Sequence, residues 1–151
     1  MILLVDDDFI AVRAHIRELR EHGLPVELRN TAERALTDFQ ANLAQWTCAI
    51  VDIMMAAPAG LEEAPGDGLS TGIHLASRMR KDRPGLPIIF LTNQRDAAIL
   101  NQAENFAEPC LCIDKREMKI DEFRRKVVSF LREVGAPGVG SGGSAPPASN
   151  P

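Results

Sequence analysis

The sequence predicts an α/β fold, a doubly wound, five-stranded parallel sheet covered by five helices. Two observations predict it. Five short apolar runs rich in β-branched residues alternate along the chain with five longer amphipathic segments, which is typical of parallel strands joined by crossover helices. Hydrophobic residues make up 45% and charged residues 25% of the 151 residues, the composition of one ordinary globular domain.

The expected strands and helices follow from these runs and from capping residues. The strands are expected at residues 2–5, 26–28, 48–51, 88–91 and 111–113. Asp8 is a suitable N-cap for the first helix, and Gly23 fits the position after its end. The second helix is expected to begin near Asn30, with Glu33 completing a capping box. The other helices are expected at residues 69–83, 96–106 and 120–134.

The composition also limits the class of protein. The chain has no apolar run of about 18 residues and no basic leader after Met1, so we expect no membrane span, no signal peptide and a cytoplasmic location. The net charge of −4 gives no electrostatic basis for nucleic-acid binding. Gly, Ser and Pro dominate from residue 135 on, which predicts one domain over 1–134 and a disordered tail over 135–151. We expect reduced thiols at Cys48, Cys110 and Cys112. We expect the three helix histidines, His15, His22 and His74, to lie at the surface.

Chemically distinctive side chains follow four of the expected strands. Asp6 and Asp7 come after the first strand, Asp52 after the third, Thr92 after the fourth and Lys115 shortly after the fifth. With a strand order of 2-1-3-4-5, they would meet at the carboxyl edge of the sheet, where open parallel sheets bind ligands. Three carboxylates in one crevice repel each other, and Mg²⁺ relieves that repulsion. A lysine and a hydroxyl beside them suit a phosphoryl group.

This set of residues resembles the receiver domain of response regulators, the CheY-like domain of two-component signalling, over residues 1–134. The resemblance rests on Asp6 and Asp7 in LLVDDD, Asp52 in AIVDIMM, Thr92 in IIFLTN and Lys115 in LCIDK. It implies a flavodoxin-like fold in which Asp52 is the phosphoacceptor. Thr92 and Lys115 would hold the phosphoryl group after transfer and pull their loops towards it.

The resemblance implies a magnesium site at the same place. Asp7 would bind Mg²⁺ directly, and Asp6 would act through a metal-bound water. Asp52 and the backbone carbonyl of Met54 would complete the protein ligands.

The implied function is that of a single-domain response regulator, a phosphoprotein in phosphorelay signal transduction. It would receive its phosphoryl group from a sensor histidine kinase or a phosphotransfer protein and signal by binding a downstream protein. We expect no enzymatic activity beyond Mg-dependent self-phosphorylation and self-dephosphorylation. Two alternatives remain open: a phosphorylation-independent pseudo-receiver that binds partners constitutively, and a haloacid-dehalogenase-type phosphatase with Asp6 as nucleophile and Asp8 as acid/base.

The sequence departs from the receiver pattern at four places. Cys112 stands where many receivers have an aromatic residue that turns inward on activation. Arg116 replaces the proline that usually follows the lysine across a cis peptide, so we expect a trans or strained peptide there. Asn93 stands where a smaller residue is usual. The loop before Gly68 is unusually long. Its insertion at 57–67 is either a solvated surface loop, a lid over the site, or a surface specific to one kinase.

Overall fold

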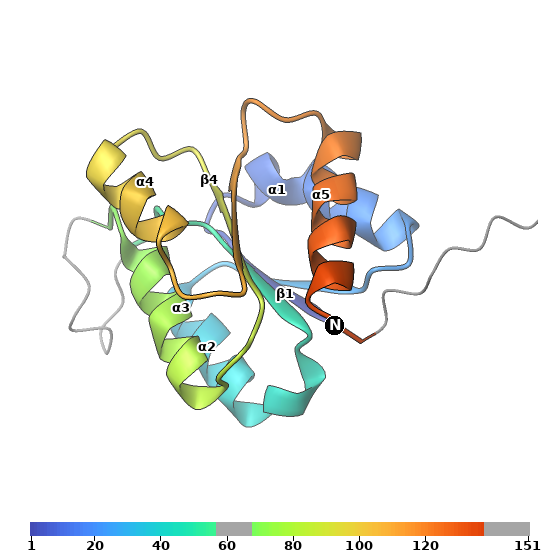
Figure 1. Ribbon diagram of the computed structural model, residues 1–151, viewed down its shortest axis with the longest axis horizontal. Coiled ribbons are helices and arrows are strands. Elements are labelled where there is room, and N and C mark those ends of the chain that lie inside the picture. The colour runs from blue at the N-terminus through green and yellow to red at the C-terminus, as the bar shows by residue number, and fades with distance from the viewer. Residues whose placement is uncertain (57–67, 138–151) are drawn as a thin grey trace, which may run out of the picture.

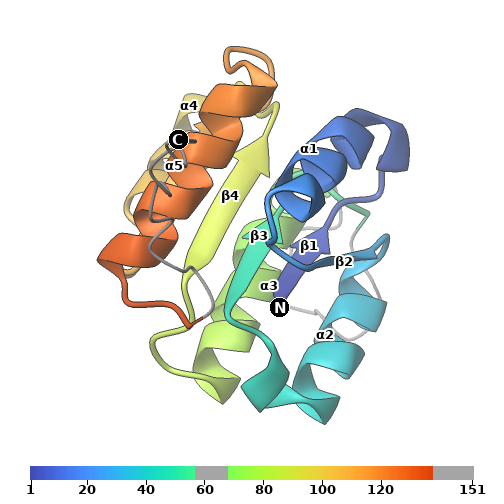
Figure 2. The same cartoon turned by 90° about the vertical axis from the view of Figure 1, so that its right-hand side faces the viewer.

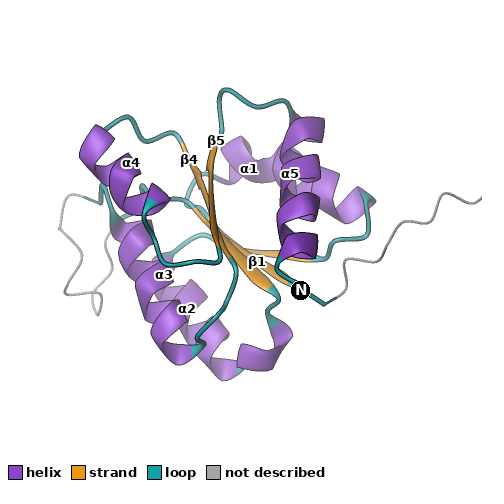
Figure 3. Ribbon diagram, viewed as in Figure 1, coloured by secondary structure: helices purple, strands orange, loops and turns teal. Residues whose placement is uncertain are grey.

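The computed structural model describes residues 1–56 and 68–137 as one parallel sheet with helices on both faces (Figures 1 and 3). The strand order is β2-β1-β3-β4-β5, so the predicted fold class and strand order are confirmed. The insertion at 57–67 and the tail from residue 138 lie outside the described residues. The strands are β1 Ile2–Val5, β2 Val26–Arg29, β3 Cys48–Val51, β4 Ile88–Thr92 and β5 Cys110–Asp114.

Two helices cover one face of the sheet and three cover the other (Figures 1 and 2). The helices are α1 Phe9–Glu21, α2 Ala32–Ala41, α3 Thr71–Asp82, α4 Ala97–Glu104 and α5 Ile120–Glu133, with a 3₁₀ turn at Leu43–Gln45. Helices α1 and α5 pack on one side, whereas α2, α3 and α4 pack on the other. No helix among the described residues combines the length and apolar character needed to cross a membrane.

The central strands are buried on both faces because each alternates its side chains between two apolar layers. In β1, Ile2 and Leu4 face the layer with α1 and α5, whereas Leu3 and Val5 face the layer with α2, α3 and α4. All four side chains are at most 2% exposed. This two-sided burial holds the strand ends rigidly, and the strand ends carry the candidate site.

Helix boundaries agree with the capping predictions at α1 and differ from them at α2 and α3. Asp8 caps α1 by accepting a hydrogen bond of 3.0 Å from the backbone N–H of Ala11, and Gly23 follows with φ +77°. The predicted N-cap of α2 at Asn30 is wrong, because the Thr31 hydroxyl accepts the bond from the first turn. Helix α3 begins at Thr71, two residues after the predicted start.

The predicted surface position of the helix histidines is wrong for His15. Its side chain is 8% exposed, and its ring meets the Phe123 ring edge-on at a centroid distance of 4.7 Å. The reason is that α5 packs over α1, so the face of α1 that carries His15 lies in a helix interface. His22, near the end of α1, is exposed as predicted.

Candidate functional site

Strand register places the two central acids side by side. Val5 of β1 pairs with Val51 of β3, and Asp6 and Asp52 are the next residue on each strand. The backbone N–H of Asp52 donates to the Val5 carbonyl at 2.8 Å, which continues the ladder to the strand tips. Both side chains are buried, Asp6 at 1% and Asp52 at 7% exposure.

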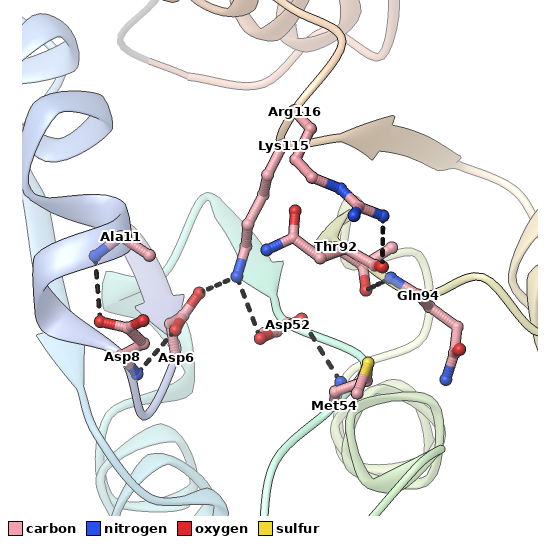
Figure 4. Close-up of polar contacts among 10 residues, drawn as sticks. Asp6, Asp8, Ala11, Asp52, Met54, Thr92, Gln94, Lys115 and Arg116 are labelled. Atoms are coloured by element: carbon pink, nitrogen blue, oxygen red, sulfur yellow. Dashed lines mark hydrogen bonds and ion pairs between the residues drawn. The ribbon is translucent and has the colours of Figure 1, made fainter.

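Lys115 reaches these two acids from the end of β5, the edge strand next to β4. Its ammonium lies 2.5 Å from Asp6 Oδ2 and 3.0 Å from Asp52 Oδ2, and its side chain is 6% exposed. The backbone N–H of Lys115 donates to the Thr92 carbonyl at 3.0 Å, which fixes the start of the lysine at the end of β4. Figure 4 shows the lysine reaching down between the two carboxylates.

Burial and the neighbouring charges have opposite effects on the pKa values of Asp6, Asp52 and Lys115. Burial raises the pKa of both the Asp6 and the Asp52 carboxyls, and Lys115 offsets part of that rise. Burial alone would lower the pKa of Lys115, but the charge of Asp52 and the bond to Asp6 outweigh it and raise that pKa. Lys115 therefore stays protonated and favours the ionised acids, which the desolvated site would otherwise disfavour.

The acids fit a hard divalent cation. One carboxylate oxygen each from Asp6, Asp7 and Asp52 lies within 4.8 Å of the others, and oxygen donors at this spacing suit Mg²⁺. Asp7 is the exposed member, and it can receive a partly hydrated ion from solvent. Both oxygens of Asp6 already accept hydrogen bonds, Oδ1 from the Asp8 N–H and Oδ2 from Lys115, which agrees with an indirect role for Asp6.

Thr92 and Met54 lie on the other side of Asp52, as Figure 4 shows. The Met54 N–H donates to Asp52 Oδ1 at 3.3 Å; metal binding by the Met54 carbonyl remains a prediction. Thr92 is 2% exposed, and its side chain helps to lower the pKa of Asp52 against the larger effect of burial. The structure thus brings together all five side chains that the sequence singled out for this edge: Asp6, Asp7, Asp52, Thr92 and Lys115.

Three departures from the receiver pattern, at Asn93, Cys112 and Arg116, lie among the described residues. The peptide between Lys115 and Arg116 is trans, as expected; the cis peptide in the described part of the chain precedes Pro109. Arg116 donates from Nη2 to the Asn93 carbonyl at 3.0 Å, which ties the loop after β5 to the loop after β4. Cys112 is half-buried against the layer formed by α2, α3 and α4, and burial raises the pKa of its thiol.

A glycine that the sequence reading missed fixes the backbone of Asp52. Gly72 lies in the first turn of α3, where its N–H donates to the Ile53 carbonyl at 2.9 Å. A Cβ placed on Gly72 would lie 1.9 Å from the Asp52 carbonyl oxygen, so only glycine allows this approach. The available signal was a glycine inside an otherwise helical pattern, which costs about 1 kcal/mol relative to alanine and so indicates a packing reason.

Comparison with known proteins identifies the fold. No family model matches the chain, and no curated protein matches it. A CheY-like response regulator receiver domain protein from Methanospirillum hungatei is 22% identical with a TM-score of 0.70, over 89% of this chain and 94% of that one. A response regulator receiver protein from Sinorhizobium medicae is 19% identical with a TM-score of 0.65, over 88% and 94%. The response regulator TrrA from Thermotoga maritima, in complex with Mg²⁺ and BeF, is 25% identical with a TM-score of 0.64, over 85% and 96%.

The sheet topology and the charged carboxyl edge define a doubly wound α/β domain with its site at the strand ends. Within that class, the chain has the fold of CheY-like response regulator receiver domains, as the resemblance predicted.

Proposed function

We propose that the protein is a single-domain response regulator whose Asp52 accepts a phosphoryl group in a Mg²⁺-dependent reaction. The observation that carries the proposal is the Lys115 ammonium, which bridges Asp6 and Asp52 at the buried strand ends. A lysine held between two acids is placed to exchange one carboxylate contact for a phosphoryl oxygen. The donor would be a sensor histidine kinase or a phosphotransfer protein, and the phosphorylated form would signal by binding a downstream protein.

The chemistry follows from the groups at the site. A carboxylate oxygen of Asp52 attacks the phosphorus of the donor, forming an O–P bond as the P–N bond of a phosphohistidine breaks. The electron pair of that bond leaves with the imidazole. With a small acyl phosphate, the P–O bond to the acyl oxygen breaks instead, and its electron pair leaves with the carboxylate. Asp6, Asp7 and Asp52 would hold Mg²⁺, which when bound neutralises charge on the transferring phosphoryl oxygens. Lys115 and the Thr92 hydroxyl would then hold oxygens of the attached group.

The contacts of Asp8 favour this reading over a phosphatase. A phosphatase of the haloacid-dehalogenase type would need Asp8 as its acid/base, but Asp8 Oδ1 is engaged as the cap of α1. Asp8 also lies outside the three-carboxylate cluster. Beyond self-phosphorylation and self-dephosphorylation, we propose no catalytic activity.

The test is to incubate the protein with acetyl phosphate and Mg²⁺, measure the intact mass, and map the modified residue. We expect one phosphoryl group on wild type and none on Asp52→Asn. Asp8→Asn is the matched control, because asparagine caps a helix about as well as aspartate, so this variant should still be phosphorylated.

Each other outcome points to an alternative function. A phosphoryl group on Asp6 that accumulates in Asp8→Asn, because that variant lacks the base that activates water for its hydrolysis, would identify a phosphatase. A wild-type protein that takes up no phosphoryl group and binds no beryllofluoride would be a pseudo-receiver.

A further inference from the structure

Gln94 is a buried polar residue to which the receiver chemistry assigns no part. It lies two residues after Thr92 and is 6% exposed. Its Oε1 accepts bonds from the backbone N–H groups of Arg95 at 2.7 Å and Asp96 at 2.9 Å. Its Nε2 donates to the Leu69 carbonyl at 3.0 Å. The side chain thus folds the loop after β4 and fastens it to the segment that leads into α3.

Gln94 also constrains the Thr92 hydroxyl. The backbone N–H of Gln94 donates to Thr92 Oγ1 at 3.0 Å. A hydroxyl has one proton to donate and two lone pairs, so this contact uses a lone pair and leaves the proton available to donate. Any displacement of Thr92 towards a phosphoryl group must therefore either break this bond or carry Gln94 with it.

Besides the backbone bond from the Lys115 N–H to the Thr92 carbonyl, the loop after β4 has side-chain links towards β5 and towards α3. On the β5 side, Arg116 and Arg95 reach Asn93 and Asp114 with side chains that are 48% and 61% exposed, and exposed ion pairs contribute little. On the α3 side, the bond is donated by the amide of Gln94, a residue that is 6% exposed, and a buried donor left without a partner is expensive. Among these side-chain links, the one to Leu69 therefore passes on a displacement of the loop after β4 most effectively.

We propose that Gln94 is a positioning residue that orients the Thr92 hydroxyl and transmits its displacement to the segment before α3 through the Leu69 carbonyl. The inference rests on the proposed phosphoacceptor function and adds the route of its output. Cys112 supplies no ring to move, so the route through β5 lacks its usual mobile part. The Leu69 side chain is 39% exposed, so a partner can contact it and sense the change.

The experiment measures chemical shifts by NMR before and after Mg²⁺ and beryllofluoride are added. The Thr92 amide reports binding at Asp52, and the Leu69 carbonyl carbon reports the bond from Gln94. The Gly72 amide lies next to the backbone of Asp52 and is a second reporter of binding that does not depend on Gln94. We expect all three to shift in wild type. In Gln94→Met, which keeps the side-chain length but loses its hydrogen bonds, the Thr92 and Gly72 shifts remain and the Leu69 shift is lost.

A second variant separates transmission from loop folding. Gln94→Glu keeps the acceptor for Arg95 and Asp96 but lacks the Nε2 donor, so it should also lose the Leu69 response. Gln94→Met keeps the backbone N–H that bonds to Thr92 Oγ1 but loses the two bonds by which the side chain holds this loop in place. It should therefore also be phosphorylated by acetyl phosphate about fivefold more slowly, which corresponds to about 1 kcal/mol at 1.4 kcal/mol per tenfold.

The outcomes distinguish this inference from the function on which it rests. A Leu69 response that persists in both variants, or that is absent from wild type while Thr92 responds, overturns the role of Gln94 and leaves the phosphoacceptor function intact. A wild-type protein in which Thr92 does not respond overturns both.

Discussion

Replacing Gly72 by alanine should displace the backbone of Asp52 and cost both stability and phosphorylation rate. The added Cβ would lie 1.9 Å from the Asp52 carbonyl oxygen, 2.7 Å from its carbonyl carbon and 2.8 Å from Ile53 Cα. Real Cβ contacts are essentially never shorter than 3.0 Å. The contact must therefore open by at least about 1.1 Å, and no side-chain rotation can open it because all three atoms are backbone.

The size of the effect follows from three contributions. Alanine gains about 1 kcal/mol over glycine in helix propensity. Overpacking costs about 1–3 kcal/mol, and loss of the bond from the Gly72 N–H to the Ile53 carbonyl costs about 1 kcal/mol more. We expect a net decrease of about 1–3 kcal/mol in the free energy of unfolding. A displacement of about 1 Å at a reacting group can also slow the reaction by about a hundredfold.

Urea unfolding measures the stability, and acetyl phosphate with intact mass measures the rate. Arg78→Ala is the matched control, because it places alanine at an exposed position of the same helix and should change stability by no more than about 0.5 kcal/mol. If Gly72→Ala unfolds and reacts like wild type, the approach of α3 to Asp52 does not position this proposed phosphoacceptor.

Three further predictions follow from the raised and lowered pKa values. Because burial raises the pKa of Asp6 and Asp52, the folded state takes up protons before the unfolded chain does, and their contribution to stability rises as pH falls from 7 through their folded pKa. Asp52→Asn should therefore be more stable than wild type at pH 7 and show a smaller gain on acidification, as measured by urea unfolding at several pH values. Burial lowers the pKa of His15, so the unfolded chain takes up a proton on this residue before the folded state does. The free energy of unfolding of wild type should therefore decrease relative to that of His15→Phe as pH falls below about 6.5. Burial raises the pKa of Cys110 to about 12, so about 10⁻⁴ of it is thiolate at pH 8, and iodoacetamide should label the native protein far more slowly than the unfolded chain. Rapid labelling of the native protein would contradict that burial.

The strand ends could be predicted from the sequence because sheet geometry leaves them little freedom. Once β1 and β3 are neighbours in parallel register, Asp6 and Asp52 must lie side by side, since each follows a paired valine. Lys115 is equally constrained, because Thr92 pairs with Asp114 and the lysine comes next. Residue type and the two-residue period of a strand were sufficient at these positions.

Contacts between loops and helices could not be predicted in the same way. The amide of Gln94 meets the Leu69 carbonyl across 25 residues of sequence, and no local pattern specifies that approach. The sequence does not fix the start of α2, because Asn30 and Thr31 are both suitable caps and only the local backbone decides which one takes the bond. The burial of His15 could not be predicted from a local pattern, because its contact with α5 arises only when the helices pack together.

There is a physical reason why the chain matches the receiver pattern at the charged strand ends and departs from it at Cys112 and Arg116. Transfer of a phosphoryl group requires charges at fixed distances, and Asp6, Asp52 and Lys115 occupy buried strand ends that hold such distances. Output requires only that some contact differ between two states. Cys112 and Arg116 therefore can depart from the receiver pattern without disturbing the chemistry, provided that another contact moves with Thr92. The buried amide of Gln94 supplies such a contact, which favours an output surface at the start of α3.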